Sequence, residues 1–243
     1  MGDGGGPAVW NRSAKTLAVG WEAGLRQSLT TLKPHFVAGD IPVVMLGDEV
    51  NDGGIGVDKT AAVATFTRSV LEGWGVRNVL LYVNEGSDVW NSSGAKTFSG
   101  YIGAHVSPAI DVISTDRYRC ATYTGSVPQR CDPLSELELV RGMYEREIFP
   151  KLSSKQRVYV VPGLFGDSNR SVAEQDAQLV HKLSQYWQWA KAESRIIGVM
   201  PWHYSTRRQS KYNLTGNHYE ALGVVAFPQV RALLRKISTT LER

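Results

Sequence analysis

The chain has 243 residues, of which 42% are apolar, and this is enough to bury the core of one large α/β domain or two small ones. Its 27 lysines and arginines and 23 aspartates and glutamates are scattered, which favours a solvated surface over a nucleic-acid-binding patch. The sequence holds no run of about 18 apolar residues, and its glycine-rich start is neither basic nor apolar, so it predicts neither a membrane span nor a signal peptide.

Five apolar, β-branched runs have the length of buried strands and alternate with segments of helical periodicity. In chain order we expect a helix over 14–32, a strand over 41–46, a helix over 59–73, a strand over 79–83, a weaker helix over 96–106, a strand over 110–114, a helix over 134–149, a strand over 158–161, a helix over 172–192, a strand over 196–200 and a helix over 219–241. Continuous apolar strands between amphipathic helices indicate a parallel sheet covered by helices.

Two α/β architectures suit this alternation, the (β/α) barrel and the doubly wound sheet, because each unit takes about 30 to 50 residues. No glycine-rich phosphate loop follows a strand, which disfavours nucleotide-binding sheets. In both architectures the functional groups lie at the carboxyl ends of the strands, where the loops begin.

Acidic residues follow four of the five predicted strands, and polar-tipped aromatic residues follow two of them. After the five strands stand, in order, Asp48-Glu49, Asn84-Glu85, Asp116 with Tyr118, Asp167, and Trp202-His203. Glycosidic cleavage needs a proton donor and a second carboxylate, and the apolar faces of sugars stack on tryptophan and tyrosine. These strand ends therefore predict a carbohydrate site.

The adjacent acids Asp48 and Glu49 are the best catalytic candidates. Neighbouring carboxylates repel one another and shift each other's proton affinity, a cost that a catalytic site can use. Glu49 is expected to be the catalytic acid. Asp52 and Asp167 are better explained as N-caps of the helices that follow them.

The other strand-end residues each allow a functional and a structural interpretation. Glu85 and Asp116 either act in catalysis or cap a helix or bind a neighbouring loop. Tyr118 and Trp202 either face the ligand or pack at the rim. His203 is either a proton shuttle or a structural residue, and Trp187 and Trp189 are expected to pack within their helix.

No cluster of histidine or cysteine has metal-ligand spacing, so we expect no metal and no cofactor, and no serine-hydrolase elbow is present. Cys120 and Cys131 either form a disulfide in a surface loop or are two free thiols. Four Asn-x-Ser/Thr triplets suggest a secreted or lumenal glycoprotein. They begin at Asn11, Asn91, Asn169 and Asn213.

The strand-end strings resemble those of a group of glycoside-hydrolase-like TIM-barrel proteins from diverse eukaryotes, over roughly residues 14 to 205. The strings are Val44-Met45-Leu46-Gly47-Asp48-Glu49, Asn84-Glu85, Asp111-Val112-Ile113-Ser114-Thr115-Asp116-Arg117-Tyr118, Val160-Val161-Pro162-Gly163 and Gly198-Val199-Met200-Pro201-Trp202-His203. The resemblance implies an α/β fold of the TIM-barrel type, incomplete, with five parallel strands that correspond to the last five βα units. Residues 1–13 are then a flexible N-terminus and 14–243 a single glycoside-hydrolase-like barrel domain.

By the same resemblance, the Asp48-Glu49 segment ends the fourth barrel strand, where many retaining glycosidases carry the general acid/base, and this supports Glu49. The pair is also similar to the Asp-Glu pair of the β-N-acetylhexosaminidases. That likeness implies that Asp48 orients a substrate acetamide, that Glu49 is the acid and that Tyr118 contacts the acetamide. The histidine of that family's motif is missing, since Val44 or Met45 stands in its place.

Two functions from different classes follow. The first is a glycoside hydrolase in which Glu49 protonates the leaving oxygen, Glu85 or Asp116 acts as nucleophile or base, and Asn84, Tyr118, Trp202 and His203 hold the sugar. The second is a non-catalytic carbohydrate-binding or remnant barrel protein, because three βα units of the resembled barrel have no counterpart ahead of residue 14. The chain is then a fragment, a short gene model or a reduced barrel. A doubly wound hydrolase or transferase explains the strand-end acids less well.

Overall fold

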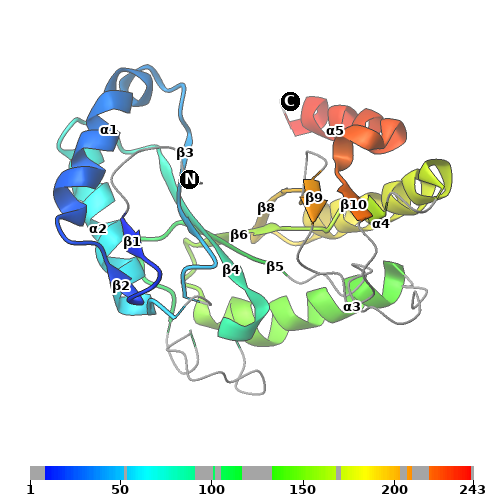
Figure 1. The fold of residues 1–243 in the computed structure, drawn as a ribbon, viewed down its shortest axis with the longest axis horizontal. Coiled ribbons are helices and arrows are strands. Elements are labelled where there is room, and N and C mark those ends of the chain that lie inside the picture. The colour runs from blue at the N-terminus through cyan, green and yellow to red at the C-terminus, as the bar shows by residue number, and fades with distance from the viewer. Residues whose placement is uncertain are drawn as a thin grey trace. The chain divides into compact units, whose positions relative to one another are not determined.

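A computed structural model describes residues 9–51, 54–90, 101, 105–116, 133–167, 171–202, 207–209 and 219–241 (Figure 1). The chain divides into two compact units. Unit 1 comprises Met1–Asp116 and Glu145–Val158, and unit 2 comprises Arg117–Tyr144 and Tyr159–Arg243. Most of the helix expected over 96–106 lies outside the described residues. So do Asp52, Asn91, Tyr118, Cys120, Cys131, Asn169, His203 and Asn213.

A sheet of five parallel strands forms the centre of the fold. Its strands are β3 (Val43–Asp48), β4 (Leu80–Gly86), β5 (Val112–Asp116), β6 (Arg157–Val160) and β8 (Ile196–Val199). Their order in the sheet, β3-β4-β5-β6-β8, repeats their order in the chain. A doubly wound sheet reverses direction at a switch point, whereas a barrel adds each strand beside the last. The structure therefore confirms the predicted α/β fold with five parallel strands of an incomplete barrel.

The first three strands end later than the apolar pattern predicts. Hydrogen bonding between β3 and β4 continues past the apolar run to the pair Asp48 and Asn84, and β4 and β5 remain paired up to Gly86 and Asp116. The polar residues at these strand ends thus belong to the sheet itself. Their backbones take part in the hydrogen-bonded ladder. The face of the sheet on which each side chain lies is therefore fixed.

Unit 1 covers one face of its strands with α1 (Trp21–Ala38) and α2 (Val57–Glu72), which lie side by side in Figure 1. The Trp21 and Phe66 rings meet edge to face, with centroids 5.3 Å apart. The helix predicted over 14–32 begins later, because a hairpin of β1 (Trp10–Asn11) and β2 (Thr16–Leu17) precedes it. Gly20 and Gly39 flank α1 in the left-handed conformation, with φ of 71° and 83°, which a side chain disfavours.

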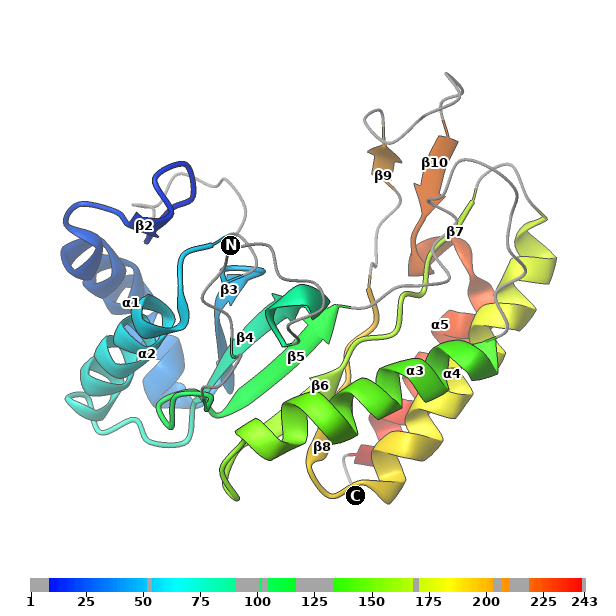
Figure 2. The ribbon, with the colours of Figure 1, turned by 90° about the horizontal axis from the view of Figure 1, so that it is seen from below.

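Unit 2 carries α3 (Pro133–Met143), α4 (Val172–Ala192) and α5 (Pro228–Leu241) (Figure 2). The predicted bounds of α4 are confirmed, and its N-cap is Ser171, whose hydroxyl accepts from the Glu174 amide at 3.4 Å. Asp167 is not that cap, since it lies in β7 (Gly166–Asp167). Among the described residues, no helix is both long and apolar enough to cross a bilayer.

The single helix predicted over 219–241 is wrong in its first third. That part forms β10 (Tyr219–Leu222), which pairs antiparallel with β7 and with β9 (Arg207–Gln209), and then a 3-10 turn (Val224–Ala226). Residues from the turn and from α5 join Leu164 and Leu183 of the unit 2 core, so burial against distant parts of the chain decides this local structure.

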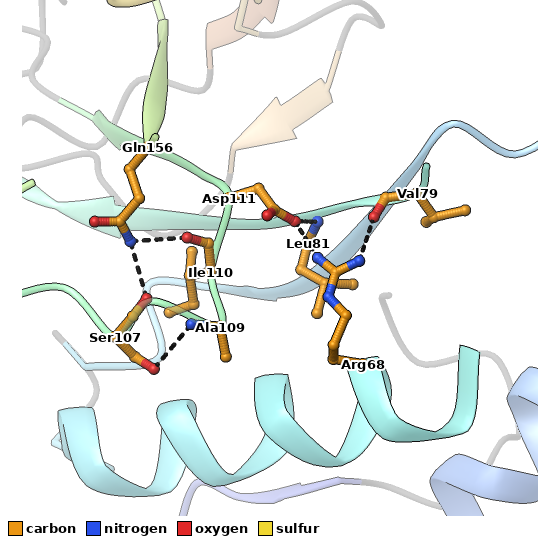
Figure 3. Close-up of polar contacts among 8 residues, drawn as sticks. All are labelled: Arg68, Val79, Leu81, Ser107, Ala109, Ile110, Asp111 and Gln156. Carbon is orange, nitrogen blue, oxygen red and sulfur yellow. Dashed lines mark hydrogen bonds and ion pairs between the residues drawn. The ribbon is translucent and has the colours of Figure 1, made fainter. Parts of the chain in front are cut away.

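Polar contacts tie together the amino ends of the unit 1 strands (Figure 3). Arg68 of α2 forms an ion pair with Asp111 and donates to the Val79 carbonyl at 2.8 Å, and the Asp111 carboxylate accepts from the Leu81 amide at 2.7 Å. The Gln156 amide group donates to the carbonyl oxygens of Ser107 and Ile110 at 2.9 and 2.8 Å. These contacts lie at the opposite end of the sheet from the candidate site, where barrels carry stabilising residues.

Candidate active site

A β-bulge in β3 decides which strand-end acid shares a face with its neighbours. Met45 pairs with Tyr82 and Gly47 with Val83, so Leu46 is an extra residue without a matching partner in β4. Side chains alternate along a strand, and an inserted residue therefore reverses the face of everything after it. As a result Asp48, paired with Asn84, lies on the face of Tyr82 and away from the helix-covered face.

Four polar side chains form a directed hydrogen-bond chain on that face, which we call the Asp48 relay: Tyr82, Ser114, Asn84 and Asp48. The Asn84 amide nitrogen donates to Asp48 Oδ1 at 2.8 Å, and the Asn84 amide oxygen accepts from the Ser114 hydroxyl. Ser114 has thereby used its only hydrogen, so the Tyr82 hydroxyl, 2.6 Å from Ser114 Oγ, is the donor in that contact. The donors of the relay all point along the chain toward the Asp48 carboxylate.

Glu49 is the next residue after the relay, and its backbone is strained. Its φ is 49°, in the left-handed region that residues other than glycine rarely adopt. The Glu49 amide still donates to the Asn84 carbonyl at 2.8 Å, so the ladder holds this conformation in place. Its side chain is half-buried. Strain of this kind clusters at functional sites, which favours the catalytic role expected for Glu49.

Glu85 lies on the opposite face, toward α2, with no exposed surface. Its two carboxylate oxygens accept from Asn51, one from the backbone amide at 3.1 Å and one from the side-chain amide at 2.5 Å. Asn51 in turn accepts from the Thr60 hydroxyl of α2 at 3.0 Å and donates to the Tyr101 hydroxyl at 3.3 Å. Glu85 therefore anchors the corner after Glu49, and its burial closes it to a substrate.

Glu85 also affects Tyr101. The Tyr101 ring stacks on Trp90, with ring centroids 4.6 Å apart. Burial, and then the negative charge of Glu85, raise the pKa of Tyr101 well above its ordinary value, so its hydroxyl stays protonated. Trp90 donates from its indole nitrogen to the Thr115 hydroxyl at 3.2 Å. The helix-covered face at this end of the sheet is thus a closed, hydrogen-bonded layer.

Asp116 ends β5 on the same face as Ser114, because the two are two positions apart in one strand. Its register partner is Gly86, one step beyond the Glu85 and Thr115 pair and closer to the strand ends. Asp116 is half-buried, and its Oδ1 atom is shielded from solvent. β4 separates Asp116 from Asp48, so their strands are about 10 Å apart, two strand spacings.

Unit 2 contributes a strand-end tryptophan of its own. Trp202 forms a parallel bridge with Gly163, its amide donates to the Pro162 carbonyl at 3.0 Å, and its carbonyl accepts from the Leu164 amide at 2.5 Å. These bonds fix its backbone, and the residue is 38% exposed. Trp202 therefore has a fixed backbone and a partly exposed side chain at the carboxyl end of β8.

The structure brings Asp48, Glu49, Asn84 and Asp116 together at the strand ends of unit 1, as the sequence predicts, and separates Glu85 from them. Sequence reasoning missed the relay members Tyr82 and Ser114 and the anchor residue Asn51. The sequence signal that indicates such a relay is a serine inside a buried strand, because a buried hydroxyl needs a hydrogen-bond partner. Within the described ranges, no group of three or more His, Cys, Asp or Glu could hold a metal ion.

No family model and no curated protein matches this chain. Among solved structures, it is similar to a GH113 β-1,4-mannanase, solved alone and as a complex, with 14% identity and a TM-score of 0.46 in both cases. That match covers 88% of this chain and 61% of the mannanase. An endo-1,4-β-xylanase from Penicillium canescens matches with 16% identity and a TM-score of 0.38, over 81% of this chain and 62% of the xylanase.

The chain spans about three fifths of the length of these enzymes. At such identities the likeness concerns the fold alone. Their substrates and activities are properties of those proteins, and the case for chemistry in this chain rests on its own strand-end residues.

Proposed function

We propose that the protein is a glycoside hydrolase that cleaves an oligo- or polysaccharide by carboxylate general acid/base catalysis at the carboxyl ends of β3, β4 and β5. The observation that carries the proposal is the Asp48 relay with the strained Glu49 beside it. Burying a chain of hydrogen-bond donors that ends on one carboxylate costs desolvation free energy. A functional role for that carboxylate explains why the chain is there.

The proposed roles follow from position in the sheet. Glu49, half-buried at the end of β3, protonates the leaving oxygen, and Asp116 at the end of β5 activates the attacking water. Asp48, fixed by Asn84, orients the sugar by accepting from one of its hydroxyls.

The spacing of the strands bears on the stereochemical course. The acid at the end of β3 and the base at the end of β5 stand on strands about 10 Å apart, with β4 between them. Retaining enzymes need carboxyl groups roughly 5 Å apart, whereas inverting enzymes leave a gap of about 6.5 to 9.5 Å for water. Two strand spacings are closer to the second separation than to the first, and we therefore propose inversion.

Trp202 is assigned to sugar binding on separate grounds in unit 2. Its backbone is held by two hydrogen bonds to the segment after β6, and its indole is partly exposed. Apolar sugar faces stack on a partly exposed indole ring of this kind. Trp202→Ala should weaken carbohydrate binding at least about fivefold.

A second function, non-catalytic carbohydrate binding, is favoured by one observation. Glu85, a carboxylate that the sequence offers for catalysis, is fully buried and committed to Asn51. If Asp116 does not act as a base, the site holds an acid without a partner, and such a site binds sugar without cleaving it.

The deciding experiment is a hydrolysis assay on a panel of β-linked mannans, xylans, glucans and chitin oligomers, with Glu49→Gln and Asp116→Asn as test variants. Glu72→Gln, an exposed acid at the end of α2, is the matched control. Both test variants should lower kcat at least about 100-fold with the fold intact by circular dichroism, and the control should keep wild-type activity.

Proton NMR of the first product identifies its anomer, and inversion is the expected result. Full activity of Glu49→Gln on a substrate that the wild type cleaves would reject the assignment. Tight sugar binding by the wild type without any cleavage would support the non-catalytic function instead.

A further inference from the structure

A cavity between α4 and α5 of unit 2 stands apart from the strand-end site. It encloses about 320 Å³ and is lined by Ser184, Trp187, Gln188, Lys191, Leu233, Lys236 and Ile237. α4 runs back from the strand ends toward the start of β8 at Ile196, and the cavity lies along its last two turns. It therefore belongs to the opposite end of the unit from Trp202. We refer to it as the α4–α5 cavity.

The floor and walls of the α4–α5 cavity are apolar. Ile237 is buried in the unit 2 core, and Trp187 and Leu233 are partly buried against that core. The sequence indicates that Trp187 packs within its helix, and the structure adds that its ring also lines a cavity. A volume of this size lies at the small end of the range for ligand sites, which are mostly apolar with a few placed polar groups.

The described charged residues that line the cavity have one sign. Two exposed lysines, Lys191 and Lys236, line it, and none of the described lining residues is acidic. The Lys191 ammonium lies 5.9 Å from the centre of the Trp187 ring. The nearby Glu193 binds Arg195 through both carboxylate oxygens, at 2.9 and 3.0 Å, and so does not neutralise the rim.

The uncharged polar side chains of the cavity are few. Ser184 donates its hydroxyl hydrogen to the Val180 carbonyl at 2.8 Å, so the uncharged N–H donors among the described lining residues belong to Gln188 and Trp187. The two lysines add charged donors, which favour a negatively charged ligand over a neutral polyol. The lining suits an apolar body with one negative group.

We infer that the α4–α5 cavity binds a small aromatic anion, a carboxylate or sulfonate whose ring lies against Trp187, Leu233 and Ile237 and whose charge pairs with Lys191 and Lys236. An aromatic ring stacks favourably on an indole, and an acidic group pairs with the ammonium groups of the two lysines in the same lining. This site is independent of the proposed hydrolase activity.

The test uses fluorescence titration of the full chain with anilinonaphthalene sulfonate, and with phenylnaphthylamine as an uncharged probe of similar shape. We expect one-to-one binding of the sulfonate that weakens as ionic strength rises. Lys191→Gln combined with Lys236→Gln should lower sulfonate affinity about tenfold and leave the uncharged probe nearly unaffected. Ser184→Leu, which fills the cavity without changing its charge, should weaken both probes.

Lys33→Gln is the matched control, because Lys33 lies 5.3 Å from the centre of the Trp74 ring in unit 1 and so reproduces the lysine and tryptophan pair at another place. Its affinity for the sulfonate should stay within about twofold of the wild type. Equal losses in this control and in the double lysine variant would overturn the proposal, as would sulfonate binding that neither the double variant nor Ser184→Leu weakens.

Discussion

At the scale of single residues, the candidate site depends on where each hydroxyl and amide hydrogen goes. The Asp48 relay runs in one direction because Ser114 has a single hydrogen and gives it to Asn84. The Asn84 amide oxygen accepts this hydrogen bond from Ser114. The amide nitrogen of Asn84 therefore points toward Asp48 and donates to it. A hydroxyl two strands away thus sets the orientation of the group that holds the carboxylate.

We expect Ser114→Ala to lower kcat about tenfold, because the Asn84 amide loses the contact that orients it toward Asp48. The measurement is kcat on the substrate found in the panel, with the free energy of unfolding from urea denaturation. The matched control is Thr115→Val, which removes the next hydroxyl on the helix-covered face. Equal losses of kcat in the two variants would argue against a specific role for the relay.

The glycine before Asp48 is required by its surroundings. A Cβ atom at Gly47 would lie 2.1 Å from Cγ2 of Val50, which is fully buried, and 3.3 Å from the Trp10 indole nitrogen. Gly47→Ala should therefore destabilise the protein by about 2 kcal/mol or more in urea denaturation. Gly73→Ala is the control, with φ of −60° and no neighbour closer than 3.3 Å, and it should change stability by less than about 1 kcal/mol. Equal stability of the two variants would contradict the bulge geometry.

At the scale of elements, the hairpin of β1 and β2 protects the free edge of β3. β3 pairs with β4 on one side, and on the other the Trp10 indole donates to the Leu46 carbonyl at 3.1 Å and Arg12 donates to the Asp48 carbonyl at 2.6 Å. An unpaired strand edge is a template for association with another chain. The hairpin thus supplies donors where a neighbouring strand would otherwise supply them.

We expect Trp10→Phe combined with Arg12→Ala to cost about 1 to 2 kcal/mol of stability and to promote concentration-dependent association, because two carbonyl groups at the edge lose their donors. Light scattering across a concentration series measures the association, and urea denaturation measures the stability. The exposed Arg77 provides the control, as Arg77→Ala removes a similar charge elsewhere in unit 1. Monomeric behaviour of the double variant at all concentrations would show that the hairpin does not guard the edge.

At the scale of the whole molecule, the two units share β6, since Arg157 and Val158 belong to unit 1 and the rest of the strand to unit 2. Unit 2 holds a buried ion pair between Lys182 of α4 and Glu136 of α3, at 2.6 Å. Lys182 also donates to the Gly163 carbonyl at 2.9 Å. Burial lowers the pKa of Lys182, and the charge of Glu136 partly offsets this.

Lys182→Met should lower the free energy of unfolding by about 3 to 5 kcal/mol, because it leaves the Glu136 carboxylate buried without its cation. The double variant with Glu136→Leu should regain most of the lost stability. Hydrogen exchange then reports where stability is lost. We expect the loss in α3 and α4, the helices that carry Glu136 and Lys182. A double variant as unstable as the single one would contradict the ion-pair explanation.

How far the site could be foreseen differs from residue to residue. Asp48, Glu49, Asn84 and Asp116 are recognisable because polar residues directly follow apolar runs, and parallel strands gather such positions at one edge of the sheet. The inward or outward direction of each could not be foreseen, because one extra residue in a strand reverses it. Glu85, which the sequence offers as a catalytic group, lies on the face of β4 opposite Asn84 and is an anchor in the structure.

The sequence by itself determined the strands, most of the helices and their parallel arrangement, since hydrophobic periodicity acts within a few residues of chain. The tertiary structure alone decided the bulge at Leu46, the burial of Glu85, the hairpin that protects β3 and the strand at β10. Each of these depends on a partner far away in the sequence. Pairing register and burial are properties of two segments in contact, and neither segment specifies them alone.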